Sequence, residues 1–136
     1  MSTTFDTIYS YFLRNTSVDT LDLPSVFEAE VELVKDGIDE FNYRLEKNLV
    51  YDEENNIVTS DLNNTEIKCL TECMKLIILR NMLEQFVSVW EVFQNDVGRR
   101  NYGQQLAGRQ NLIDRQEHYI ESLTYKLYEE FETEET

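Results

Sequence analysis

Apolar side chains recur every three or four residues along most of this chain, the spacing that gathers them on one face of an α-helix. The pattern predicts helices over residues 2–14, 24–47, 63–95 and 104–131, with a break in the third helix near residue 81. Pro24 stands where the second helix is expected to begin, and proline suits a first helical turn. We therefore expect an all-α fold, a small bundle of four to five helices with a long C-terminal helix.

The periodicity disappears between residues 48 and 61. Two short apolar pairs, Val50-Tyr51 and Ile57-Val58, flank the polar segment 52–56 in this stretch. This arrangement predicts a loop, with a short β-hairpin as the alternative. No other sheet is expected.

The third helix is predicted to lie at the centre of the bundle, because it is apolar on most of its circumference. Asn63 and Glu66 have the spacing of a capping box at its start. The second and third helices supply the expected core, which consists of Phe27, Val31, Val34, Ile38, Phe41, Leu70, Met74, Ile77 and Ile78.

The last helix carries a narrow apolar stripe at seven-residue spacing, formed by Leu106, Ile113, Ile120 and Leu127. Such a stripe is typical of a bundle or coiled-coil contact, either within the chain or with a neighbour. A polar break over 95–103, containing Gly98 and Gly103, is expected to precede this helix. We expect one helical domain over 1–131, followed by a disordered acidic tail over 132–136.

Composition supports the helical interpretation and narrows the function. The 136 residues include one proline and four glycines, too few for the many turns of an all-β fold. The net charge of −15 argues against binding DNA by phosphate neutralisation and against docking on an anionic membrane. Because neither a secretory signal nor a bilayer-spanning run is visible, we expect synthesis in a cytoplasm and no membrane partner.

The residues that most often carry chemistry form no catalytic pattern. Cys69 and Cys73 are four residues apart in a helical pattern and are expected to be small core side chains. His118, the one histidine, is expected at the surface, and with two cysteines it cannot complete a zinc site of the usual kind. We therefore predict a protein that is not an enzyme and that needs no metal or cofactor.

Two groups of residues are candidates for binding. The most compact acidic stripe lies on the second helix and consists of Glu28, Glu32, Asp36, Asp39 and Glu40. The local basic and aromatic cluster, Arg99, Arg100 and Tyr102, is either a helix-end cation pair or a contact for an acidic or carbonyl-rich partner. Tyr119, Tyr125 and Tyr128 on the last helix are candidates for filling the core or an interface.

Four segments follow one another along the chain in a recognisable order. An aromatic segment, Tyr11-Phe12-Leu13, precedes an acidic helix that ends in Ile38-x-x-Phe41. The most specific segment runs from Asp61-Leu62 through Glu66-Ile67 and Leu70 to Met74, and the break Asn101-Tyr102-Gly103-Gln104 then precedes the long final helix. Together these segments resemble the head–tail connector (head completion adaptor) proteins of tailed bacteriophages, and the resemblance covers roughly residues 8 to 128.

The resemblance implies a structural protein of the virion. Such adaptors form a ring, commonly of about twelve copies in closed cyclic symmetry, which binds the portal protein on one side and a stopper or tail protein on the other. The ring extends the DNA channel, and DNA passes without specific binding. The acidic stripe is then the candidate channel lining. The candidate contacts with the portal or a neighbouring subunit are Arg99, Arg100, Tyr102, Tyr119, Tyr125 and Tyr128. The alternative is an acidic helical regulator, such as a DNA-mimic inhibitor that occupies a basic site on a host protein.

Overall fold

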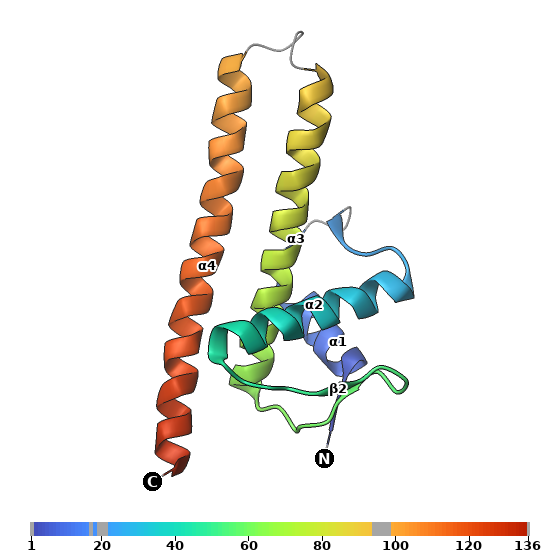
Figure 1. Ribbon diagram of the computed structural model, residues 1–136, viewed down its shortest axis with the longest axis vertical. Helices are drawn as coiled ribbons and strands as arrows, with labels where there is room; N and C mark the ends of the chain where they lie inside the picture. The colour runs from blue at the N-terminus through green and yellow to red at the C-terminus, as the bar shows by residue number, and fades with distance from the viewer. Residues whose placement is uncertain (1, 17, 19–21, 94–98, 136) are drawn as a thin grey trace.

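Two long antiparallel helices dominate the computed structural model (Figure 1). They are α3 (Asn64–Phe93) and α4 (Arg99–Glu135). The shorter α1 (Phe5–Asn15) and α2 (Phe27–Leu45) pack against the N-terminal part of α3, so the far ends of α3 and α4 project as an arm. The structure describes residues 2–16, 18, 22–93 and 99–135, without the side chains of 90–101 and 131–135. The all-α class and the long C-terminal helix are confirmed.

Three very short strands form a small sheet that joins the segment before α1 to the segment before α3. The hairpin of β2 (Tyr51–Asp52) and β3 (Ile57–Val58) confirms the alternative predicted for the 48–61 segment. β1 (Thr3–Thr4) adds to the other edge of β3, so the expectation of no sheet beyond a hairpin was wrong. The Thr3 hydroxyl donates to the Ser60 carbonyl and accepts from the Leu62 amide, both at 3.0 Å. These bonds fix β1 beside the approach to α3.

Both short helices begin later than periodicity predicts. In α1, Thr4 is the N-cap and accepts a hydrogen bond from the Thr7 amide. The helix α2 starts at Phe27 instead of residue 24, and no side chain caps it. Phe27 is 67% exposed, which makes its predicted place in the core wrong. The first turn of α2 projects beyond the packed part of the helix, so Phe27 has little core to contact.

The core is continuous and centres on α3. Of the nine expected core residues, Val34, Ile38, Phe41, Leu70, Met74 and Ile78 are buried, whereas Val31 and Ile77 are half-buried at its edge. The core also takes in the fully buried Ile8 and Phe12 of α1, with Ile120 and Leu127 of α4. The helix α3 has α1, α2 and α4 as neighbours, which confirms its predicted central position.

The helix α3 begins as predicted but does not break. Asn63 accepts from the Glu66 amide at 2.8 Å and Glu66 accepts from the Asn63 amide at 3.1 Å, which confirms the capping box. The predicted break near residue 81 is wrong, because α3 is helical throughout Asn64–Phe93. Neither Arg80 nor Asn81 is a proline, so both residues keep the backbone N–H that a helix needs. Arg80 also forms ion pairs with Glu40 of α2 and Glu117 of α4.

The helix α4 is longer at both ends than predicted. It begins at Arg99, so the expected break over 95–103 is wrong for residues 99–103, and Gly103 and Gly108 are helical. Its backbone continues through Glu135, whereas a tail separate from the helix was expected over 132–136. Glutamate is a good helix former and no proline or glycine interrupts this segment, so the helix continues. The seam residues Ile120 and Leu127 are buried and Leu106 and Ile113 are half-buried.

Candidate interaction surfaces

The predicted acidic stripe on α2 divides into two parts. Glu28, Glu32, Asp36 and Asp39 are exposed and form a row along the solvent side of the helix. Lys35 lies at the edge of this row, with its Nζ 3.4 Å from a Glu32 oxygen and 3.8 Å from a Glu53 oxygen. Since one lysine faces several carboxylates, the row keeps a net negative charge that a cation or a basic surface would complement.

Asp36 shows the effect of this crowding. Partial burial, together with the neighbouring charges of Glu32 and Asp39, raises the pKa of the Asp36 carboxyl above its usual value. The ionised form of Asp36 is therefore destabilised in the folded chain, and a cationic partner would stabilise it.

Glu40 belongs to a different network. Its side chain is largely covered and accepts from Arg44 Nε at 3.0 Å, and Arg80 Nη1 lies 3.4 Å away. Arg80 also reaches Glu117 of α4 at 3.3 Å. Burial lowers the pKa of Arg80, but the two carboxylates outweigh it and raise that pKa overall. Arg80 of α3 thus joins Glu40 of α2 to Glu117 of α4, and this network separates Glu40 from the exposed acidic row.

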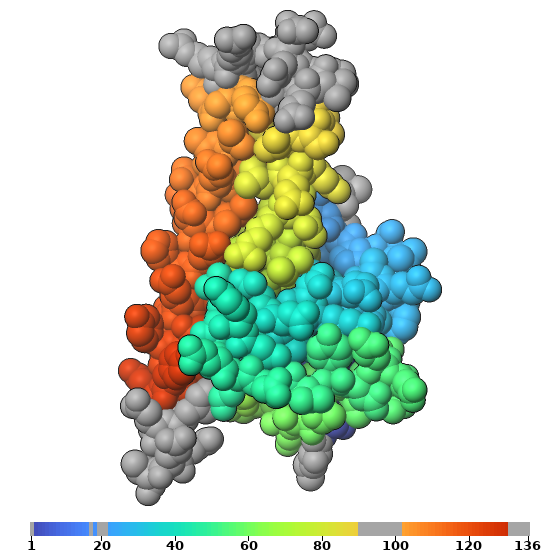
Figure 2. Space-filling model, viewed as in Figure 1, coloured from blue at the N-terminus to red at the C-terminus, as the bar shows by residue number. Residues whose placement is uncertain are grey.

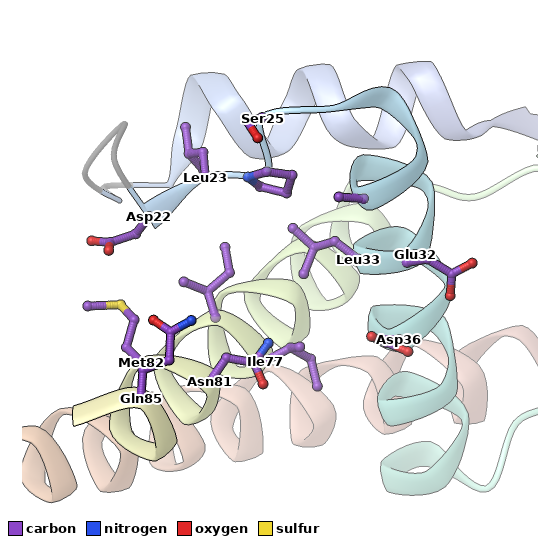
Figure 3. A pocket seen from close by; sticks show the side chains of 13 residues that line it. Asp22, Leu23, Ser25, Glu32, Leu33, Asp36, Ile77, Asn81, Met82 and Gln85 are labelled. Carbon is purple, nitrogen blue, oxygen red and sulfur yellow. The ribbon is translucent and has the colours of Figure 1, made fainter. Parts of the chain in front are cut away.

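A groove of about 560 Å³ opens beside the acidic row, between α2 and α3 (Figure 3). Its apolar wall comes from Leu23, Leu33, Ile77 and Met82, and Asn81 and Gln85 add amides. The carboxylates of Asp22, Glu32 and Asp36 also line it. Chemically, the groove suits a segment that brings an apolar side chain together with a lysine or an arginine.

The predicted basic and aromatic cluster lies at the start of α4. Arg99 and Arg100 occupy the first turn of this helix, and their side chains lie outside the described residues. Tyr102 stacks on Phe86 of α3, with ring centroids 5.7 Å apart and an interplanar angle of 11°. The guanidinium of Arg109 lies 4.5 Å from the same Phe86 ring. This stack joins the two helices of the arm.

The three tyrosines predicted for contacts occupy two sides of α4. Tyr119 is on the side where Lys68 of α3 places its Nζ 6.0 Å from the Tyr119 ring centroid. Interaction with Tyr119 raises the pKa of the Lys68 amine. Tyr125 and Tyr128 are exposed on the other side, and Tyr125 is 72% exposed. None of the three fills the core.

The two cysteines and the histidine lie where the sequence predicted, the cysteines in the core and the histidine at the surface. Cys69 and Cys73 are fully buried, and the hydrogen bond between them, with burial, raises the pKa of the Cys73 thiol. His118 is 81% exposed, and its Nδ1 lies 3.7 Å from a Glu121 oxygen. Among the described residues, no cluster of three histidine, cysteine or acidic side chains has the geometry of a metal site. In the same part of the chain, no helix is both long and apolar enough to cross a membrane.

Sequence reasoning missed Lys68, Phe86 and Arg109 as partners of the candidate residues. It also missed two rows at seven-residue spacing that run beside the apolar seam of α4. One row is Leu112, Tyr119 and Lys126, and the other is Asp114, Glu121 and Tyr128. The signal was present, because each row is offset by one residue from the seam of Ile113, Ile120 and Leu127.

Comparison with known proteins assigns the family. A family model described as YomZ prophage protein matches residues 1–129. The chain belongs to the YomZ prophage protein family. A Bacillus subtilis (strain 168) relative, described as an SPbeta prophage-derived uncharacterized protein YomZ, is 31% identical over 121 residues. The match covers 89% of this chain and 92% of the relative. No solved structure matches the chain. Membership of the YomZ family identifies a phage-derived protein.

Proposed function

We propose that this YomZ-family chain is a structural protein of the virion. It forms a ring between the portal protein and the tail or stopper protein and extends the DNA channel. It is made in the host cytoplasm, carries out no catalysis and uses no cofactor. Its prophage family and the sequence resemblance to head–tail connectors support this proposal.

One observation supports it most directly: the exposed acidic row and the three candidate contact tyrosines lie on different helices. The acidic row belongs to α2, which also carries the exposed Tyr43, whereas Tyr119, Tyr125 and Tyr128 belong to α4, the helix at the edge of the molecule (Figures 1 and 2). A ring subunit needs surfaces for its neighbours and a separate surface that faces DNA without binding it. The α4 tyrosines suit the first role, and Glu28, Glu32, Asp36 and Asp39 suit the second.

The far end of the arm is the proposed contact with the portal. Arg99 and Arg100 belong to the first turn of α4, and Tyr102 of the same turn stacks on Phe86 of α3. The N-terminus of a helix carries a partial positive charge, which adds to the charge of these two arginines. An acidic or carbonyl-rich surface on the portal would complement it.

The test is deletion of the corresponding gene from an inducible prophage that carries it. Loss of the ring should give DNA-filled heads and separate tails in the lysate, and a plasmid-borne copy should restore joined particles. The R99E/R100E variant should fold normally, with an unchanged circular dichroism spectrum, but fail to enter particles. Normal joined particles from the deletion strain would contradict the proposed function.

The second candidate function is that of an acidic regulator or DNA mimic, which the exposed acidic row of α2 favours. The lysate of the same deletion strain tests it. A DNA mimic would leave virion structure intact after the deletion and would bind a basic host protein in competition with duplex DNA. Such a result would replace the ring proposal.

A further inference from the structure

The helix α4 has an unusual position for a bundle helix. Within the described part of the chain, α3 is the one element against which α4 packs along its length. Because α3 covers one side of α4, residues on both flanks of this contact are exposed, among them Arg115 on one and Glu121 on the other. Its exposed apolar and aromatic side chains are Leu112, Tyr119, Tyr125 and Tyr128.

One open flank carries more cations than anions; its carboxylates are Glu130, which accepts from Thr65, and Glu72 of α3, which accepts from Gln116. Leu112, Tyr119 and Lys126 follow one another at seven-residue spacing and therefore share a face. Lys68 of α3 lies against Tyr119, which fixes the side of the molecule that this face occupies. Arg115 is also exposed and lies within about 40° of Tyr119 around the helix, at 3.6 residues per turn. We call these four residues and Lys68 the cationic flank.

The opposite open flank is acidic. Asp114, Glu121 and Tyr128 also follow at seven-residue spacing, with Tyr125 beside them. Glu117 fixes the position of this face, because it pairs with Arg80 on the side of α3 that faces Glu40 of α2. Asp114 and Glu121 are exposed. We call Asp114, Glu117, Glu121, Tyr125 and Tyr128 the acidic flank.

We infer that the cationic flank of α4 in one copy packs on the acidic flank of α4 in the next copy. The inference rests on the proposed ring and names the surfaces that join its subunits. The occupant is a second copy of this chain, because the two flanks carry opposite charges and both present exposed tyrosines, Tyr119 on one and Tyr125 with Tyr128 on the other. In a chain of net charge −15, a cationic face is scarce, so the two flanks select each other.

The contact is heterologous, since it joins two different faces. Heterologous contacts repeat from copy to copy and give a closed ring when the rotation closes. A two-fold contact of the cationic flank with itself would bring Arg115 and Lys126 toward like charges. The tyrosines and Leu112 supply apolar area, and the ion pairs add specificity that salt weakens.

Charge exchange on the two flanks tests this directly. The R115E/K126E variant makes both flanks acidic, and D114K/E121K makes both basic. Each variant alone should lose the larger species that the wild-type chain forms in sedimentation velocity and light scattering at low salt. An equal mixture of the two should restore that species, because every contact again joins opposite charges. The chain that carries all four substitutions should also restore it.

The matched control is E54K/D61K, which makes the same charge change as D114K/E121K at two exposed positions outside α4. This control should associate at least as well as the wild type. No rescue in the mixture, or a loss of association in the control, would overturn the contact.

Particle composition separates this inference from the proposed function. A wild-type chain that stays monomeric in solution while particles still contain it would overturn the flank contact and leave the virion role standing. Association and rescue in solution, with particles that lack the protein, would overturn the virion role and leave the flank contact standing.

Discussion

Gly37 of α2 lies directly against Met74 of α3. A Cβ placed on Gly37 would come 2.5 Å from Met74 Cγ and 3.5 Å from the Leu70 carbonyl oxygen. Met74 is fully buried, and its Cγ is close to the backbone, so it has little room to move aside. The glycine is therefore what allows α2 to approach α3 at the centre of the core.

Replacing Gly37 by alanine should destabilise the protein. Overpacking a core costs about 1–3 kcal/mol, whereas alanine in place of glycine within a helix gains about 1 kcal/mol. The net effect should be a lower midpoint in urea unfolding. Gly108→Ala is the matched control, because nothing lies within 4 Å of its added Cβ. That variant should be stabilised by about 0.5–1 kcal/mol, and equal behaviour of the two variants would contradict the close approach.

Alanine substitutions of Phe41 and Phe27 should have very different effects on the free energy of unfolding, although both residues lie on α2. Phe41 is fully buried, so Phe41→Ala should cost about 3–5 kcal/mol through lost burial and an unfilled cavity. Phe27 is exposed, so Phe27→Ala should change the free energy of unfolding by less than about 0.5 kcal/mol. Chemical denaturation followed by circular dichroism measures both. A large cost at Phe27 would show that its side chain is covered.

These two phenylalanines show how far the sequence could predict the fold. Three-to-four spacing includes both of them on one stripe, and it cannot tell where along that stripe the neighbouring helix ends. The cap at Asn63 and Glu66 was predictable because both partners lie within one turn. By contrast, β1 could not be predicted, since Thr3 finds Ser60 and Leu62 across more than fifty residues.

The candidate sites were predictable to a similar degree. Helical spacing placed Glu28, Glu32 and Asp36 on one exposed face of α2. It also placed Glu40 on that face, although Glu40 pairs with Arg80, forty residues away. The sequence predicts a helix break near Arg80 and gives no sign of this ion pair. Ion pairs between helices depend on the packing of the whole bundle, which one sequence does not disclose. The two flanks of α4 were encoded locally and could have been found from their seven-residue spacing.

Asp36 should make stability depend on pH in a direction opposite to that of a salt-bridged carboxylate. Its pKa is raised in the folded state, so between its ordinary value of 3.8 and the raised value the native chain holds the proton more tightly than the unfolded chain. This contribution therefore favours folding as pH falls through that window and is lost as pH rises through the folded pKa. Asp36→Asn should stabilise the protein at neutral pH by up to about 1 kcal/mol, the usual size for exposed charges.

The Asp36→Asn advantage should disappear at a pH below 3.8, where Asp36 is protonated in both states. Thermal melts of both proteins across this pH range measure the difference, and Asp61→Asn at an exposed loop position is the control. A constant difference at all pH values would show that the effect comes from packing and not from the charge of Asp36.

The exposed acidic row should govern how DNA moves through the proposed ring. Glu32, Asp36 and Asp39 would repel phosphates from the channel wall, and salt screens this repulsion over about 8–10 Å at physiological ionic strength. A negative lining would keep the duplex centred and let it slide, whereas a basic lining would bind it. The E32K/D36K/D39K variant should therefore assemble into particles and eject DNA more slowly, most visibly at low salt.

The E46K/E54K/D61K control, which makes the same change of charge at exposed positions outside the row, should eject DNA at the wild-type rate. Ejection at the wild-type rate from fully assembled E32K/D36K/D39K particles would contradict the lining role and leave these carboxylates as surface groups that keep the chain soluble.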